Sequence, residues 1–109
     1  MKISDRNING SVVRDNEVYT VIDNVYLKNL TLSKTVLNPS KRTSGHLHDD
    51  IDEIYFFISG VGRIKLDDEE TLVSAGDVVL IPSGTFHQVF NDSDEYQLEF
   101  NCVFESYKR

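Results

Sequence analysis

Residues 45–53 of this chain read GHLHDDIDE, and residues 76–91 read GDVVLIPSGTFHQVFN. Together these two stretches contain all three histidines of the sequence. Histidine is the commonest neutral metal ligand near physiological pH, because its imidazole is then largely unprotonated. Three histidines and a glutamate gathered at one place would form a metal site. The two stretches therefore predict a metal-binding protein.

The spacing of these residues suits β-strands. Residues i and i+2 of a strand point to the same face, so His46 and His48 would present two imidazoles side by side. Glu53 follows an acidic turn and can supply an oxygen ligand from the neighbouring strand. His87 follows the turn at residues 82–84 and would complete the site from a third strand. This donor set suits Fe(II), Mn(II), Ni(II), Cu(II) or Zn(II).

Composition bounds the class of protein. A chain of 109 residues has room for one compact domain but not for two. Its net charge of -7 repels nucleic acids and anionic lipids, so we expect a partner that is a small molecule and neither nucleic acid nor membrane. The N-terminus lacks an apolar signal segment, and Cys102 has no second cysteine to pair with. These features favour a cytoplasmic location.

Short runs of β-branched and aromatic residues recur between turn residues along most of the chain. Turns about every 8–12 residues are typical of an all-β sandwich or barrel. The expected strands cover residues 18–22, 25–32, 35–37, 54–58, 62–66, 71–73, 78–81, 86–90 and 96–104. The polar residues 1–16 are expected to form an N-terminal arm or a first edge strand, and residues 17–109 the barrel domain.

The two stretches resemble the two sequence motifs of the cupin superfamily. These are written G-x5-H-x-H-x(3,4)-E-x6-G and G-x5-P-x-G-x2-H-x3-N. The matching residues are His46, His48, Glu53 and Gly60 for the first, and Gly76, Pro82, Gly84, His87 and Asn91 for the second. The spacer of fifteen residues between the motifs matches small single-domain cupins. One position departs: Ser40 stands where the first motif begins with glycine, in an expected turn where serine is tolerated.

The resemblance implies an all-β, double-sheet jelly-roll barrel, the architecture of cupins. It implies a divalent transition metal (Fe, Mn, Zn or Ni) as cofactor. The implied metal ligands are His46, His48, Glu53 and His87. Small cupins commonly pair through edge strands or N-terminal arms, so the resemblance also implies a homodimer.

Three residues are candidates for contact with a substrate. If Glu53 points inward, the period of two places Tyr55 and Phe57 on the same face, unless a bulge shifts the register. The Tyr55 hydroxyl can donate a hydrogen bond to a substrate, although packing as a core aromatic is the simpler interpretation. Arg42 would share the face of His46 on a continuous strand. Its planar fork suits a carboxylate or phosphate, and a solvated surface position is the alternative.

The cupin fold supports many reactions, so it does not by itself specify one. Our first hypothesis is a metal-dependent enzyme that acts on a small anionic organic molecule, of dioxygenase type if the metal is iron. The alternative enzyme is an isomerase or lyase of a sugar or sugar acid, in which the metal polarises a carbonyl and Glu53 or Tyr55 moves a proton. The non-catalytic alternative is a sensor module that binds a small molecule or a metal.

Overall fold

Residues 1–106, which the computed structural model describes, form nine β-strands and no α-helix. The strands are β1 (Ser11–Asp15), β2 (Tyr19–Asn24), β3 (Leu30–Leu37), β4 (Glu53–Ser59), β5 (Val61–Leu66), β6 (Glu69–Ser74), β7 (Val78–Ile81), β8 (His87–Phe90) and β9 (Leu98–Glu105). The all-β prediction is therefore confirmed. In this part of the chain no helix is long and apolar enough to cross a membrane.

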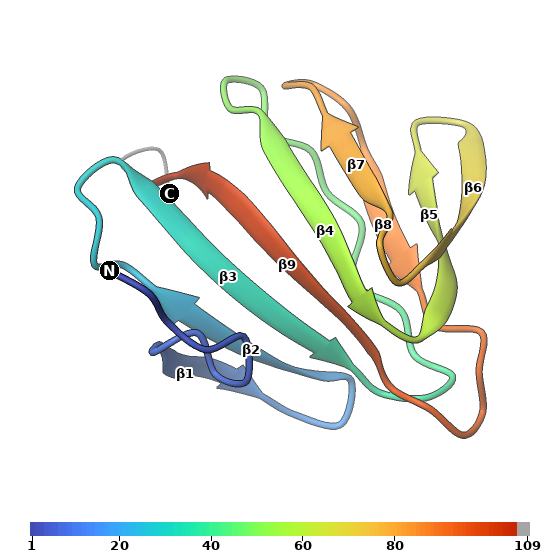
Figure 1. Ribbon diagram of the computed structural model, residues 1–109. Helices are drawn as coiled ribbons and strands as arrows, with labels where there is room; N and C mark the ends of the chain where they lie inside the picture. The colour runs from blue at the N-terminus through green and yellow to red at the C-terminus, as the bar shows by residue number, and fades with distance from the viewer. Residues whose placement is uncertain (107–109) are drawn as a thin grey trace.

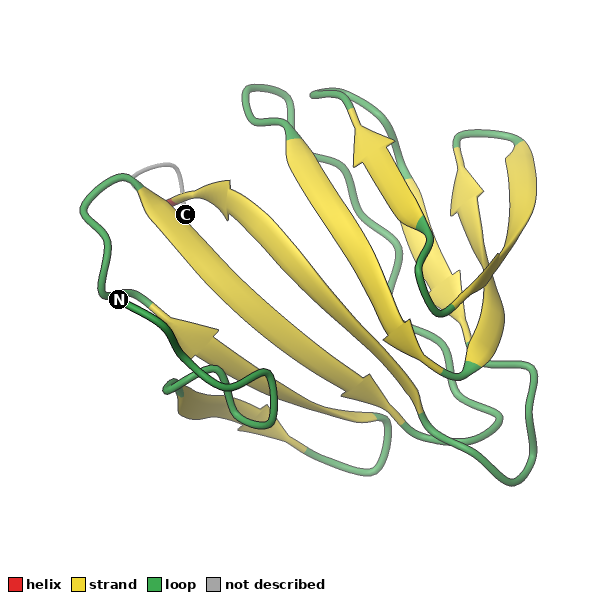
Figure 2. Cartoon of the chain, in the orientation of Figure 1, coloured by secondary structure: helices red, strands yellow, loops and turns green. Residues whose placement is uncertain are grey.

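The strands form two antiparallel sheets that make a jelly roll (Figures 1 and 2). The larger sheet has the order β1-β2-β3-β9-β4-β7, and the smaller sheet has the order β6-β5-β8. In Figure 1 the smaller sheet stands beside β4 and β7, while β1 and β2 lie at the far end of the larger sheet. The chain crosses repeatedly between the two sheets, so residues far apart in sequence meet in the interior.

The hydrophobic core lies between the sheets and is built from alternate residues of each strand. β9 shows this most clearly, because Leu98, Phe100, Cys102 and Phe104 are buried while the residues between them are partly exposed. The period of two predicted for this strand is confirmed. Ile64 on β5, which is fully buried, belongs to the same apolar cluster from the smaller sheet.

The third strand differs from its prediction. The sequence pattern predicted separate strands over residues 25–32 and 35–37, but β3 is one strand, Leu30–Leu37, and residues 25–29 form a loop. The two polar residues Ser33 and Lys34 lie between the two predicted strands. β3 is an interior strand paired with β2 and β9 along its length, and this pairing on both sides outweighs the low strand propensity of the polar pair.

The polar pair in β3 is accommodated by partners on both faces of the sheet. The hydroxyl of Ser33 donates to Asp23 Oδ1 at 2.6 Å on the inner face. Lys34 points to the opposite face, where its ammonium donates to Asp5 Oδ2 at 3.1 Å and its side chain is 1% exposed. Both polar groups are thus satisfied inside a continuous strand.

The N-terminal residues cover the outer face of the larger sheet. Ile8 is 1% exposed there, and its carbonyl accepts a hydrogen bond from Asn24 Nδ2 at 2.8 Å. Asp5 accepts a second hydrogen bond, from Asn101 Nδ2 at 2.7 Å. Ile8 has a φ of +48°, an outlier for a β-branched residue, which the surrounding contacts hold in place.

The backbone conformation at Ser40 explains why the cupin pattern has glycine at this position. Its φ is +63°, in the left-handed region that glycine adopts without steric cost. The turn is held by the Ser40 amide, which donates to the Ser93 carbonyl at 2.8 Å. Serine occupies this conformation at a modest energetic cost, and the fold is retained.

Candidate metal centre

Three backbone segments position the four predicted ligands. His46 and His87 form an isolated antiparallel bridge, in which each amide donates to the carbonyl of the other at 3.2 and 2.9 Å. The His48 carbonyl accepts from the Gly84 amide at 2.6 Å, which ties this loop to the turn before β8. Glu53 is the first residue of β4 and is paired within the larger sheet.

Gly45 allows the backbone before the histidine pair to approach the smaller sheet closely. A Cβ atom at this position would lie 2.0 Å from Cζ of the Phe86 ring. A side chain at residue 45 would therefore force either the Phe86 ring or the loop that carries His46 to move.

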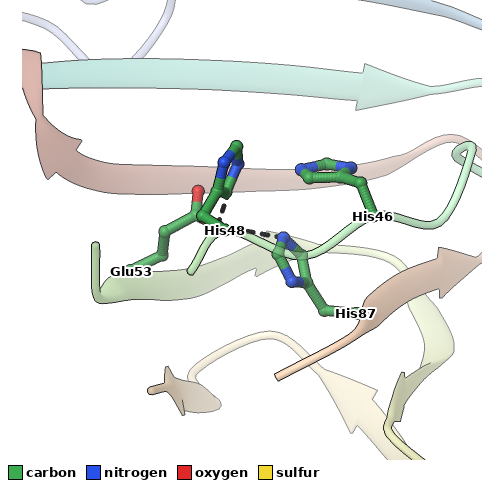
Figure 3. Close-up of side chains that lie close together, drawn as sticks. All are labelled: His46, His48, Glu53 and His87. Atoms are coloured by element: carbon green, nitrogen blue, oxygen red, sulfur yellow. Dashed lines mark ion pairs between the residues drawn. The ribbon is translucent and has the colours of Figure 1, made fainter. Parts of the chain in front are cut away.

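The four side chains converge on one point inside the barrel (Figure 3). Each residue offers one donor atom, and these atoms all lie within 4.8 Å of one another. Glu53 Oε2 lies 2.9 Å from His87 Nε2 and 3.8 Å from His48 Nε2. Among residues 1–106 this is the one such group of histidine, cysteine or acidic side chains. The structure thus brings together all four predicted ligands.

Backbone carbonyls orient two of the imidazoles. His87 Nδ1 lies 3.1 Å from the Thr85 carbonyl, and His46 Nδ1 lies 3.3 Å from the Ser44 carbonyl. A carbonyl can only accept, so Nδ1 carries the proton and Nε2 keeps its lone pair for a ligand. Metal-binding histidines in proteins are held in this way.

The burial of these groups fits a divalent cation. Glu53 is 3% exposed and His87 is 2% exposed. The Nε2 atom of His48 is buried and has no hydrogen-bond partner among residues 1–106. A carboxylate and imidazole lone pairs that are directed at one point away from water are costly unless a cation satisfies them. The residues present can therefore hold a metal ion, and their donor types suit first-row transition metals.

The surroundings also keep His46 neutral. Desolvation lowers the pKa of His46 below its ordinary value of 6.5, and the nearby His87 lowers this pKa further. A neutral imidazole is the form that binds a metal. The site is thus prepared for metal binding at neutral pH.

We expect the affinity for Zn(II) to fall as the pH drops below about 6.5, because protonated imidazole cannot bind a metal. His46 should become protonated, and so stop binding the metal, at a lower pH than an ordinary imidazole, since its pKa is lowered. In the metal-free protein the unfolded chain then binds this proton more readily than the folded chain. The free energy of unfolding should therefore also decrease as the pH falls below 6.5.

Calorimetric titration of Zn(II) at several pH values between about 8 and 5 measures the first effect, and thermal unfolding of metal-free protein measures the second. Zinc affinity that stays constant over this range would contradict the proposed ligand set.

The candidate metal site opens into a cavity of about 600 Å³. His46, His48 and Glu53 line it, together with residues from the inner face of the larger sheet. The other lining residues are Val13, Arg14, Tyr19, Val21, Asp23, Ser33, Thr35, Thr43, Ser44, Leu47, Tyr55, Phe100, Cys102 and Phe104. A small organic molecule can therefore reach the metal site from this cavity.

Tyr55 and Phe57 share the face of Glu53 as the strand period predicts, but they are placed differently. Tyr55 lines the cavity, stacks on Phe100 at 5.2 Å between ring centroids, and meets the His87 ring edge-on at 5.8 Å. Phe57 lies one step deeper, 2% exposed, and is not among the cavity residues. Its ring packs against those of Tyr55 and Phe100 in the core, and its contact with a substrate stays a prediction.

For Arg42 the structure supports the alternative expectation, an exposed surface position. Arg42 is opposite Phe90, whereas His46 is opposite His87, so the register shifts by one residue between the two bridges. A shift of one residue turns a side chain to the other face. Arg42 therefore does not line the metal cavity and instead lines two other surface cavities. The expected continuous strand is absent here.

The residues that β1, β2 and β3 contribute to the cavity could not be predicted from the sequence. Arg14, Asp23, Ser33 and Thr35 come from segments with mixed polar and apolar residues. A strand that carries polar side chains on both faces gives no signal of which face is turned inward. Only the pairing of the strands shows which of these side chains face the cavity.

Comparison with known proteins places the chain among the cupins. The family model for the cupin domain matches residues 33–104. The uncharacterized protein MJ1618 of Methanocaldococcus jannaschii is 33% identical over 61 residues, which are 56% of this chain and 49% of that protein. The chain thus spans about half the length of this curated relative.

Solved structures share the fold at low sequence identity. The protein TT1209 from Thermus thermophilus is 22% identical, with a TM-score of 0.80 over 96% of this chain and 97% of that chain. A putative sugar phosphate isomerase from Acidithiobacillus ferrooxidans is 21% identical, with a TM-score of 0.70 over 80% of this chain and 60% of that chain. At these identities the likeness concerns the fold alone.

Proposed function

This chain belongs to the family of cupin domains, and we propose that it is a metal-dependent enzyme that acts on a small organic molecule. The observation that carries the proposal is the convergence of four donor atoms within 4.8 Å, beside a cavity of about 600 Å³. A cavity of this volume is in the range that accommodates small ligands. His46, His48, Glu53 and His87 would hold the metal, and the cavity beside them would give a substrate access to it.

A bound divalent metal supplies Lewis acidity, and iron also supplies chemistry with dioxygen. Iron would favour an oxidative reaction on a small anionic compound. Manganese, zinc or nickel would favour isomerase or lyase chemistry on a sugar or sugar acid. The likeness to a putative sugar phosphate isomerase supports keeping the second reaction type as an alternative.

The chain's own residues would position the substrate and move protons. Tyr55 lines the cavity next to His87, so its hydroxyl is a candidate donor to a substrate oxygen. Glu53 is a candidate for accepting a proton from a substrate held at the site, since its carboxylate faces the same cavity. Tyr19 and Phe100 provide apolar walls that exclude water around the substrate.

The test begins with elemental analysis of protein purified without chelator, followed by assays chosen by the metal found. We expect close to one metal ion per chain. Iron leads to oxygen-consumption assays with small organic acids, and manganese, zinc or nickel leads to isomerase and lyase assays on sugars and sugar acids. Turnover should be lost in Tyr55→Phe or Glu53→Gln, whereas Glu69→Gln on the exposed side of β6 should retain it.

Two outcomes would contradict the proposal. A site that stays empty even after metals are added would remove its basis. Ligand-dependent stabilisation without any turnover would indicate a sensor module rather than an enzyme.

A further inference from the structure

Arg14 on β1 is the only arginine or lysine that lines the metal cavity within residues 1–106. It lies outside residues 33–104, which match the cupin domain model. We infer that Arg14 binds a carboxylate or phosphate at the end of the substrate remote from the metal. This inference rests on the proposed function and specifies its substrate class, an extended small organic acid or phosphate ester.

Strand pairing places Arg14 on the inner face of the larger sheet. Arg14 is opposite Val21, Val21 is opposite Thr35, and Thr35 is opposite Phe100. Residues directly opposite each other in antiparallel strands project to the same face. All four of these residues line the cavity. The side chain of Arg14 therefore belongs to a continuous row of residues that crosses the cavity wall.

A β-bulge is what turns Arg14 inward. Val12 pairs with Ile22, but the next pair is Arg14 with Val21, so Val13 is an extra residue in β1. Without this residue in the bulge, a regular register would place Val13 opposite Val21 and would turn Arg14 to the outer face. Bulges at sheet edges near functional sites commonly re-aim a side chain in this way. The bulge in this edge strand thus directs the positively charged side chain of Arg14 to the cavity.

The guanidinium of Arg14 is available for a ligand. Within the described residues Arg14 forms no ion pair, whereas Arg63 pairs with Glu70 and Asp92 on the outer surface. Asp23, the acidic residue of β2 that lines the same cavity, accepts a hydrogen bond from the Ser33 hydroxyl at 2.6 Å. In a chain of net charge -7, an arginine facing the cavity is the feature that would attract and orient an anion there.

The positions of the two sites define the shape of the ligand. Glu53 begins β4, and Arg14 lies on β1, with β2, β3 and β9 between them in the sheet (Figure 1). A molecule that contacts both must extend across the cavity. One end would bring oxygen atoms to the metal, and the other would bring an oxyanion to the planar fork of the guanidinium.

Two matched pairs of probes test this inference on zinc-loaded protein. 2-Oxoglutarate and 2-oxovalerate share a 2-oxo acid end and differ in the distal carboxylate. 3-Phosphoglycerate and glycerate share a 2-hydroxy acid end and differ in the distal phosphate. Calorimetry gives the ratio of affinities within each pair, for the wild type, Arg14→Ala, Arg14→Lys and Arg42→Ala. Arg42→Ala is the matched control, because it removes the same charge outside the cavity.

We expect the wild type to prefer the charged member of at least one pair by roughly 10-fold or more, the effect of a charge-assisted hydrogen bond. The pair with the larger preference identifies the oxyanion. In Arg14→Ala this ratio should fall to near one, and Arg14→Lys should retain part of it. Arg42→Ala should keep the full ratio. Zinc affinity and the melting temperature should not change in Arg14→Ala.

No preference in the wild type for either pair would overturn the inference, as would a preference that survives Arg14→Ala or falls equally in Arg42→Ala. The zinc titration separates this failure from failure of the proposed function. If zinc does not bind, the proposed metal site is wrong, and the same ratios measured on that protein still decide the role of Arg14.

Discussion

His87→Ala should lower the affinity for Zn(II) by at least about 100-fold, because even the loss of a group that only orients a metal ligand costs 10–100-fold. His87 is 2% exposed, and its Nε2 lies 2.9 Å from Glu53 Oε2. Its Nδ1 lies 3.1 Å from the Thr85 carbonyl, which orients the ring so that Nε2 faces the candidate metal site. Glu53→Gln should have a similar effect, since it removes the only charged ligand.

The loss of zinc binding in these variants can be measured without any substrate, because bound zinc stabilises the folded protein. A metal present at about 100 times its dissociation constant stabilises the folded protein by about 2.7 kcal/mol. Thermal unfolding with and without Zn(II) should therefore show a metal-dependent rise in melting temperature for the wild type and for Glu69→Gln. His87→Ala and Glu53→Gln should lack this rise. A rise of equal size in all four proteins would show that zinc binds elsewhere.

Asp5→Ala should lower the free energy of unfolding by about 2 kcal/mol. Breaking a buried ion pair by removing one partner typically costs 3–5 kcal/mol, and the 51% exposure of Asp5 reduces this figure because water replaces part of the interaction. The ammonium of Lys34, 1% exposed, would keep only Glu99, whose carboxylate lies 3.8 Å away. Asn101 would also lose its acceptor, now 2.7 Å from its amide.

A loss of this size corresponds to a fall in melting temperature of about 8 °C or more. Asp94→Ala, an exposed acidic residue in the loop before β9, is the matched control and should change stability by less than about 0.5 kcal/mol. Adding Lys34→Met to Asp5→Ala should recover much of the loss, because the unpaired buried charge is then removed. Equal melting temperatures for Asp5→Ala and Asp94→Ala would contradict this account.

The charge state of Asp5 gives the same interaction a pH dependence. Partial burial raises the pKa of Asp5, but hydrogen bonds from Asn101 and Lys34 outweigh it and hold this pKa below the ordinary value of 3.8. The folded state therefore favours the ionised carboxyl. Its contribution to stability is present at neutral pH and is lost as the pH falls through the lowered pKa.

The four candidate ligands could be predicted from sequence because their spacing is local. His46 and His48 are two residues apart, and Glu53 and His87 stand at fixed distances from turn residues. Predicting the ligands from this spacing, and from the likeness to a known pattern, requires no knowledge of which strand pairs with which. The alternation of β9 could also be predicted, because one face of that strand is apolar and the other is mostly polar.

Other features were decided only by the tertiary structure, because they depend on which residues of distant strands lie opposite each other. One extra residue at Val13 turns Arg14 into the cavity, and a one-residue shift before His46 turns Arg42 away from it. Each is a change of one residue in register, which reverses the face of every side chain beyond it. Lys34 interrupts the apolar pattern of its segment, and only the fold brings Asp5 to 3.1 Å from its ammonium. The sequence alone determined the all-β class, most of the strands and the candidate metal ligands, whereas the pairing of strands joined β3 into one strand and decided which other side chains face the cavity.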